Sequence, residues 1–150
     1  MMSPTGAPHG IVHTRIAGNL WSQGDQKSLG TTYVETGLIM KREPDTVLGP
    51  DAMFYPKGRE IKLSPEGWCE TMPALVVEIR SKNDTSCELA DKAELYLNAG
   101  VEMVWIADPR RKLVTEYRRG GSPIDRQIAE ALTAEPIIPG FRLPLIELFL

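Results

Sequence analysis

The sequence predicts an α/β domain built on a central mixed β-sheet flanked by helices. Two short apolar runs, Ala74–Val77 and Val101–Ala107, are typical of buried strands, and a helix-like segment separates them. A helix that joins two buried strands usually makes a βαβ crossover, in which the strands run parallel. Alternating segments before and after this unit predict antiparallel strands, so we expect a mixed sheet.

The composition is that of an ordinary globular domain. The 150 residues include 42% hydrophobic and 25% charged residues, which suits one domain with one core. We expect a single domain over residues 9–150, preceded by a mobile tail at residues 1–8. The net charge of −3 argues against a protein that coats nucleic acid through bulk positive charge. It leaves room for an enzyme whose acidic site is offset by a bound metal ion.

The first half of the chain predicts one helix followed by three strands. Apolar residues recur at helical spacing over residues 9–22. Residues 30–40 are rich in Thr, Tyr, Val and Ile and predict a strand with an irregularity at Gly37. Alternation predicts a second strand over residues 50–55, and the apolar run predicts a central strand within residues 73–80.

The second half begins with the crossover helix. We expect this helix over residues 88–99, with Gly100 as its C-cap. A buried strand follows over residues 101–107, and residues 112–117 alternate and should pair with it as a hairpin. Residues 137–150 carry prolines and apolar residues that we expect to pack over the sheet edge.

Glu78 and Asp51 are acidic residues at the ends of predicted strands. Glu78 follows the apolar run of the central strand, where a buried carboxylate is costly unless a positive group meets it. The alternative is a solvated strand end. Asp51 opens its strand directly after Pro50, and on its own it is equally compatible with an ordinary turn residue.

Lys92 lies on the face of the predicted helix that should contact the sheet. Leu89, Leu95, Tyr96 and Ala99 lie at offsets of −3, +3, +4 and +7 from it, which share one face. A lysine there either extends along apolar surface to the solvent or points at an acidic site.

Asp51, Glu78 and Lys92 can compensate one another's charges if they lie together in the folded chain. Two carboxylates from neighbouring strands can bind Mg²⁺, with the backbone carbonyl of Ile79 as a further ligand. An ammonium group nearby can stabilise a phosphate in its transition state. The combination predicts phosphodiester hydrolysis with Asp51, Glu78 and Lys92 as the catalytic residues.

Four stretches of the chain carry a resemblance to a known family. They are VETGLIMKREPDTVLGPDAMFY, PALVVEIRSKND, DKAELYLNAGVEMVWIADP and IPGFRLPLIELF. Pro50-Asp51 and the strand that ends in Glu78 resemble the motif of PD-(D/E)XK nucleases. More narrowly, the chain resembles the bacterial Uma-two family of restriction endonuclease-like proteins. The resemblance implies the restriction endonuclease-like fold.

The resemblance also implies roles for individual residues. Asp51 and Glu78 become metal ligands for Mg²⁺, for which Mn²⁺ can substitute, and Lys92 becomes a catalytic lysine that has moved from the strand to the helix. Glu35, in VETG, matches a recurrent acid of the family that could hold a second metal ion or a metal-bound water. Arg80 takes the position of the usual lysine, but it stays protonated and is a poor base.

His9 and His13 stand four residues apart on the first predicted helix. Such a pair can bind zinc, but the sequence has no further histidine and no suitably placed cysteine, so we do not expect a zinc site. His9 matches a family position at the start of the helix, which implies a contact with the active site from the helix side.

The leading hypothesis is therefore a metal-dependent endonuclease that acts on DNA as a homodimer. Dimers are usual among PD-(D/E)XK enzymes, and one domain of 150 residues offers little groove by itself. Two alternatives stay open: a catalytically silent nucleic-acid-binding module of the same fold, and a hydrolase of a small phosphate compound. No signal peptide or membrane span is evident, and Cys69 and Cys87 suggest reduced thiols, so we expect a cytoplasmic protein.

Overall fold

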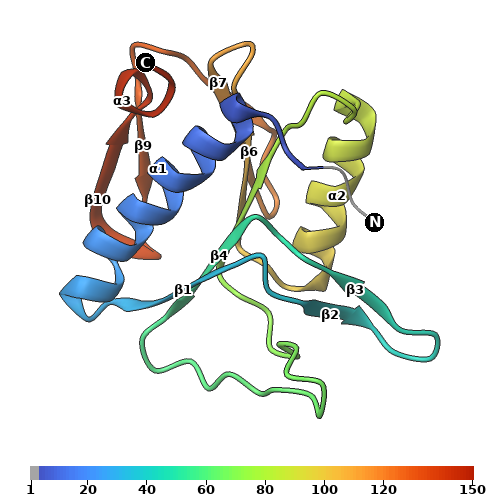
Figure 1. Ribbon diagram of the computed structural model, residues 1–150. Coiled ribbons are helices and arrows are strands. Elements are labelled where there is room, and N and C mark those ends of the chain that lie inside the picture. Colours follow the sequence, from blue (N-terminus) through green and yellow to red (C-terminus); the bar gives the residue numbers. More distant parts are fainter. Residues whose placement is uncertain (1–3) are drawn as a thin grey trace.

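The computed structural model describes residues 4–150, which fold around a six-stranded sheet (Figure 1). The strands, in their order across the sheet, are β1 (Gly30–Val34), β4 (Ala52–Pro56), β5 (Leu75–Ile79), β6 (Met103–Asp108), β7 (Leu113–Arg118) and β8 (Ile124–Arg126). Only β5 and β6 are parallel, and all the other neighbours in this sheet are antiparallel. The predicted mixed sheet and the parallel pair are confirmed.

Helix α2 (Ser86–Ala99) makes the crossover between the two parallel strands. Its first turn is fixed by a capping box: Thr85 accepts a hydrogen bond from the backbone of Glu88, and Glu88 accepts one from the backbone of Thr85. Gly100 ends the helix at a φ of 116°, a left-handed conformation in which glycine has no steric penalty. The helix therefore starts two residues earlier than predicted and stops at the predicted residue.

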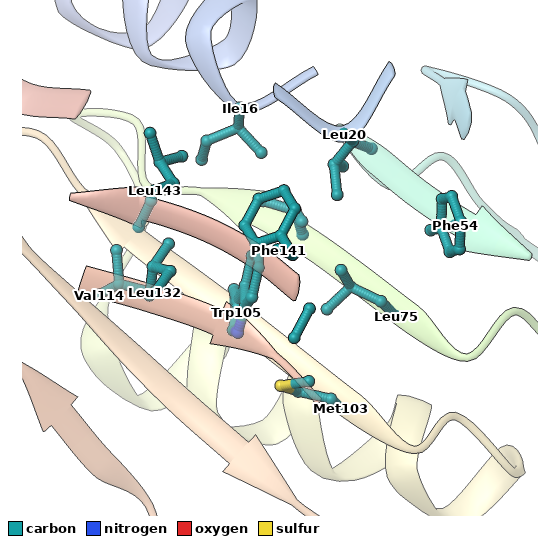
Figure 2. Packing of buried hydrophobic residues seen from close by; sticks show 14 of the residues in the cluster. Ile16, Leu20, Phe54, Leu75, Met103, Trp105, Val114, Leu132, Phe141 and Leu143 are labelled. Atoms are coloured by element: carbon teal, nitrogen blue, oxygen red, sulfur yellow. The ribbon is translucent and has the colours of Figure 1, made fainter. Parts of the chain in front are cut away.

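The two faces of the sheet carry separate hydrophobic cores. Helix α1 (Ala7–Gln23) covers one face together with β9 (Ala131–Ala134), β10 (Ile138–Pro144) and α3 (Leu145–Phe149), whereas α2 covers the other face (Figure 1). Figure 2 shows the first core, where Ile16 and Leu20 of α1 pack with side chains of the sheet and of β10. Strand β5 lies in the middle and contributes side chains to both cores.

The strand predicted over residues 30–40 is divided in two. Its first part is β1, and its second part is β2 (Leu38–Lys41), which leaves the main sheet and pairs with β3 (Thr46–Leu48), a strand that the sequence did not indicate. The irregularity falls at Gly37 as predicted. A Cβ at Gly37 would lie only 2.3 Å from the indole of Trp68, so the close approach of that ring excludes a side chain there.

The prediction for the C-terminal segment is wrong in its placement. Residues 137–150 do not lie over an edge of the sheet. They form one strand of a separate two-stranded sheet and a short helix, and Phe141, Leu143 and Leu148 are buried in the core under α1. The β9–β10 pair thus acts as a second cover on one sheet face. No helix within residues 4–150 is long and apolar enough to cross a bilayer.

Candidate active site

Asp51 and Glu78 meet where β4 begins and β5 ends. Ala52 pairs with Val77 across the antiparallel strands, which brings the preceding Asp51 opposite Glu78. Two contacts join the two strand ends: the Asp51 backbone N–H points at Glu78 Oε1 at 3.4 Å, and the backbone N–H of Ile79, the residue after Glu78, donates to Asp51 Oδ2 at 2.7 Å. The register of two neighbouring strands therefore places the two carboxylates side by side.

Helix α2 supplies two donors to the other oxygen of Glu78. Tyr96 donates its hydroxyl hydrogen to Glu78 Oε2 at 2.9 Å, and Lys92 Nζ lies 3.3 Å from the same oxygen. Lys92 and Tyr96 are one helical turn apart, so they reach the same point from one face of the helix. The Tyr96 ring is fully buried, whereas the Lys92 side chain keeps 38% of its surface exposed, which leaves its ammonium group open to a ligand.

The surroundings of Glu78 are unfavourable for its negative charge. Burial raises the pKa of the Glu78 carboxyl, and the neighbouring Asp51 carboxylate raises it further. The Lys92 ammonium and the Tyr96 hydroxyl oppose this but leave the pKa above its ordinary value. Burial, followed by the charge of Glu78, also raises the pKa of Tyr96, which therefore stays a hydrogen-bond donor. A further cation beside the two acids would relieve this imbalance.

Helix α1 approaches Asp51 from the other face of the sheet. His9 Nε2 lies 3.5 Å from Asp51 Oδ1, and His13 Nε2 lies 2.7 Å from the backbone carbonyl oxygen of Asp51. His9, His13 and Asp51 each offer a ligand atom, and these atoms all lie within 4.8 Å of one another. The family resemblance implied that His9 contacts the active site, and His9 lies beside Asp51. The sequence did not indicate Asp51 as a common partner of both histidines, because the third ligand of a histidine pair was sought among histidines and cysteines.

Glu35 and Arg80 lie near the two acids, but their side chains form no hydrogen bond or ion pair with either carboxylate within the described residues. The Glu35 backbone N–H donates to the carbonyl oxygens of Pro50 and Asp51, but its side chain is exposed and makes no hydrogen bond within residues 4–150. Arg80 Nη1 pairs instead with Ser86 Oγ at 3.0 Å and Asp108 Oδ2 at 3.5 Å. The structure thus places Asp51, Glu78 and Lys92 together with the two histidines, and leaves Glu35 and Arg80 outside this cluster.

The cluster fits a divalent cation. Two carboxylates lie next to each other, one of them buried with a raised pKa, and carboxylate oxygens are the ligands that Mg²⁺ and Mn²⁺ take in proteins. Ile79 donates its N–H to Asp51, so its peptide group lies against the same site.

The fold and this cluster define a protein of the restriction endonuclease-like class. The chain matches the Uma2 family, described as "Putative restriction endonuclease", over residues 1–145, and it belongs to that family. No curated protein matches it. Among solved structures, it is similar to a protein described as a putative nuclease belonging to DUF820 from Anabaena variabilis. The TM-score is 0.83 at 18% identity, over 99% of this chain and 83% of the other, and this likeness confirms the fold.

Proposed function

We propose that this protein is a metal-dependent endonuclease that hydrolyses phosphodiester bonds in DNA. The observation that carries the proposal is the meeting of Asp51, Glu78 and Lys92, which come from two strands and a helix, at one point. Membership of a family described as restriction endonucleases supports the same activity. We assign it to one catalytic domain, expected over residues 9–150. The domain takes in Ala7 and Pro8 as well, because α1 already begins at Ala7, so the expected tail over residues 1–8 is too long; residues 1–3 lie outside the described part of the chain.

Each residue of the cluster has a distinct role in the proposed reaction. Asp51, Glu78 and the backbone carbonyl of Ile79 would hold the ion, Mg²⁺ or Mn²⁺. When bound, the ion supplies a Lewis acid for the phosphate and lowers the pKa of a water molecule. The Tyr96 hydroxyl and the Ile79 N–H each fix one carboxylate oxygen and thereby orient both acids. The half-exposed Lys92 ammonium faces the scissile phosphate and stabilises the negative charge that grows on its oxygens.

Arg80 occupies the position of the usual catalytic lysine of the nuclease motif, but its side chain is bound to Asp108 and Ser86. In this proposal Arg80 therefore does not take the role of that lysine. Glu35 lies beside Asp51 through its backbone, with a free carboxylate on the surface of the described chain. We propose that it contacts a second ion or a metal-bound water only once substrate is present.

The test is cleavage of plasmid DNA by the unmutated protein with Mg²⁺, Mn²⁺ or EDTA, compared with Asp51→Asn and Glu78→Gln. We expect cleavage that requires a divalent ion and disappears in both variants. DNA binding without cleavage under any ion would contradict the proposal and favour the silent binding module. Hydrolysis of small phosphate esters, without binding to DNA or RNA, would favour the small-molecule hydrolase.

We also propose that the active form is a homodimer, since two sites in one assembly can cut both strands of a duplex. Light scattering of the protein at micromolar concentration measures this directly. A mass near 16.7 kDa, that of one chain, would contradict the dimer without affecting the proposed chemistry.

A further inference from the structure

Two histidines and an aspartate form a group of possible metal ligands. The proposed reaction uses the aspartate but neither of the two imidazoles. His9 and His13 are one turn apart on α1, and their rings meet edge to face with centroids 5.9 Å apart. His9 is buried, and its Nδ1 has no hydrogen-bond partner within residues 4–150, which leaves Nε2 as the atom that faces Asp51. Both imidazoles therefore lie beside Asp51, which is also a proposed ligand of the catalytic ion.

The spacing of these atoms suits coordination of one ion. Two neighbouring ligand atoms that each lie about 2.0–2.1 Å from a metal ion are separated by about 2.8–3.0 Å in octahedral geometry and by about 3.3–3.4 Å in tetrahedral geometry. His9 Nε2 and Asp51 Oδ1 are 3.5 Å apart. The full set of three ligand atoms spans at most 4.8 Å, so a small contraction brings all of them to one ion.

We propose that His9, His13 and Asp51 bind a divalent transition-metal ion, with imidazole nitrogens as two of its ligands. This inference rests on the proposed function in one respect, because Asp51 is shared with the catalytic metal site. Without metal, His13 Nε2 donates its hydrogen to the Asp51 carbonyl oxygen. On metal binding the neutral ring changes tautomer: the proton leaves Nε2, Nδ1 carries a proton instead, and the Nε2 lone pair is free to coordinate. Both histidines then bind as neutral imidazoles.

The ligand set decides which ions bind. Imidazole nitrogen suits Zn²⁺, Co²⁺ and similar borderline ions, whereas Mg²⁺ prefers oxygen ligands alone. The Asp51–Glu78 pair offers only oxygen, and the Asp51–His9–His13 group offers two nitrogens and an oxygen. We therefore expect tight binding of Zn²⁺ and Co²⁺ through α1, and weak, histidine-independent binding of Mg²⁺.

The chain has only two histidines, so imidazole ¹⁵N signals of the untagged protein report on this site alone. We expect one equivalent of Zn²⁺ to shift the Nε2 resonances of both histidines by direct coordination, and millimolar Mg²⁺, which does not coordinate the imidazoles, to shift them much less. Unmoved imidazole signals at one equivalent of Zn²⁺ would overturn the proposal. This measurement uses the unmutated protein and does not depend on whether a variant folds.

Calorimetric titration of variants provides the second measurement. His13→Ala should weaken Zn²⁺ binding by at least about tenfold, since even the outer partners of metal ligands are worth about 10–100-fold. Cys87→Ser is the matched control, because this exposed thiol is the other accessible soft ligand, and its loss should leave the affinity unchanged. Equal Zn²⁺ affinity in His13→Ala and the unmutated protein would overturn the inference.

The two proposals fail separately. If the protein cleaves DNA with Mg²⁺ but Zn²⁺ does not shift its imidazole signals, the proposed nuclease activity holds and the proposed histidine site is wrong. Zn²⁺ bound through both histidines, in a protein that cleaves no substrate with any ion, would do the reverse.

Discussion

The two acids of the site are held in different ways by the two helices. Asp51 faces α1, which presents two imidazoles, while Glu78 faces α2, which presents an ammonium group and a phenol. Both acids come from adjacent positions in one antiparallel strand pair. Their surroundings therefore differ because the helices lie on opposite faces of the sheet (Figure 1).

This difference separates the tasks of the two acids. The side chain of Asp51 is 18% exposed and that of Glu78 only 8%, so Asp51 is the more open ligand and Glu78 the more desolvated one. Charges interact more strongly where water is excluded, so the pair of Lys92 with Glu78 is the electrostatically stronger half of the site. The α2 side should accordingly set catalytic power, and the α1 side should set the choice of metal ion.

Among variants that keep both acids, Lys92→Met should give the largest effect, and it tests the α2 side directly. Removing the ammonium leaves the developing phosphate charge unstabilised, and the cleavage rate should fall by about 10²–10³-fold. The rate is measured under single-turnover conditions at saturating metal. Lys57→Met is the matched control, because Lys57 is an exposed lysine that follows the far end of β4, and its rate should not change. Equal rates in the two variants would remove Lys92 from the reaction.

Tyr96→Phe removes the buried hydrogen bond to Glu78 and keeps the aromatic packing. Because the bond reaches an ionisable carboxylate in a buried place, the free energy of unfolding should fall by about 1.5–3 kcal/mol at neutral pH. Urea denaturation measures this loss. Tyr33→Phe is a comparable change at a less buried ring, with no hydrogen bond from its hydroxyl within the described chain, and should cost much less.

The α2 side of the site was easier to anticipate from the sequence than the α1 side. Glu78 and Lys92 each interrupt an apolar pattern, and a charged residue in a core pattern is visible without a structure. Leu95, expected on the inner face, is 44% exposed, because the buried stripe runs through Leu89, Ala93 and Tyr96 instead. Lys92 therefore stands at the margin of the stripe, which is why it reaches Glu78 and still meets solvent.

The family resemblance implied that His9 contacts the active site, but the residue pattern by itself did not indicate that both histidines reach Asp51. Periodicity identifies the inner face of a helix, but it does not identify the strand that the helix crosses, and His13 and Asp51 are 38 residues apart. The C-terminal segment was misplaced for a related reason. Its prolines and apolar residues suggested packing over the sheet edge, whereas the burial of Phe141 and Leu143 depends on the neighbouring β9, whose pairing is set by tertiary packing.

Glu78→Gln tests the electrostatics of the α2 side through pH. The folded-state pKa of Glu78 is raised, so the carboxyl binds its proton more tightly in the folded protein than in the unfolded one. The contribution of Glu78 to stability is thus highest below the unfolded pKa of about 4.3, and it falls as pH rises through the folded pKa. The total fall is about 1.4 kcal/mol for each pH unit that separates the folded pKa from the unfolded one.

The measurement is urea denaturation of metal-free protein from about pH 4 to about pH 8, a range that starts near the unfolded pKa of Glu78, for the unmutated chain and Glu78→Gln. We expect the stability of the unmutated chain to decline with pH relative to the variant, because glutamine does not titrate. A constant difference across this range would show that Lys92 and Tyr96 fully compensate the buried charge.

Thr85→Ala gives the smallest effect and tests whether α2 carries its two functional residues as a rigid unit. The variant loses one half of the capping box, and the free energy of unfolding should fall by about 1 kcal/mol. The cleavage rate per folded molecule should not change, because Lys92 and Tyr96 are held by Glu78 and by the core rather than by the first turn. The N-terminus of α1 has no side-chain cap, so an equivalent loss is absent there. A fall in the cleavage rate per folded molecule would show that the first turn of α2 positions Lys92. The α2 side would then be less preorganised than its buried contacts indicate.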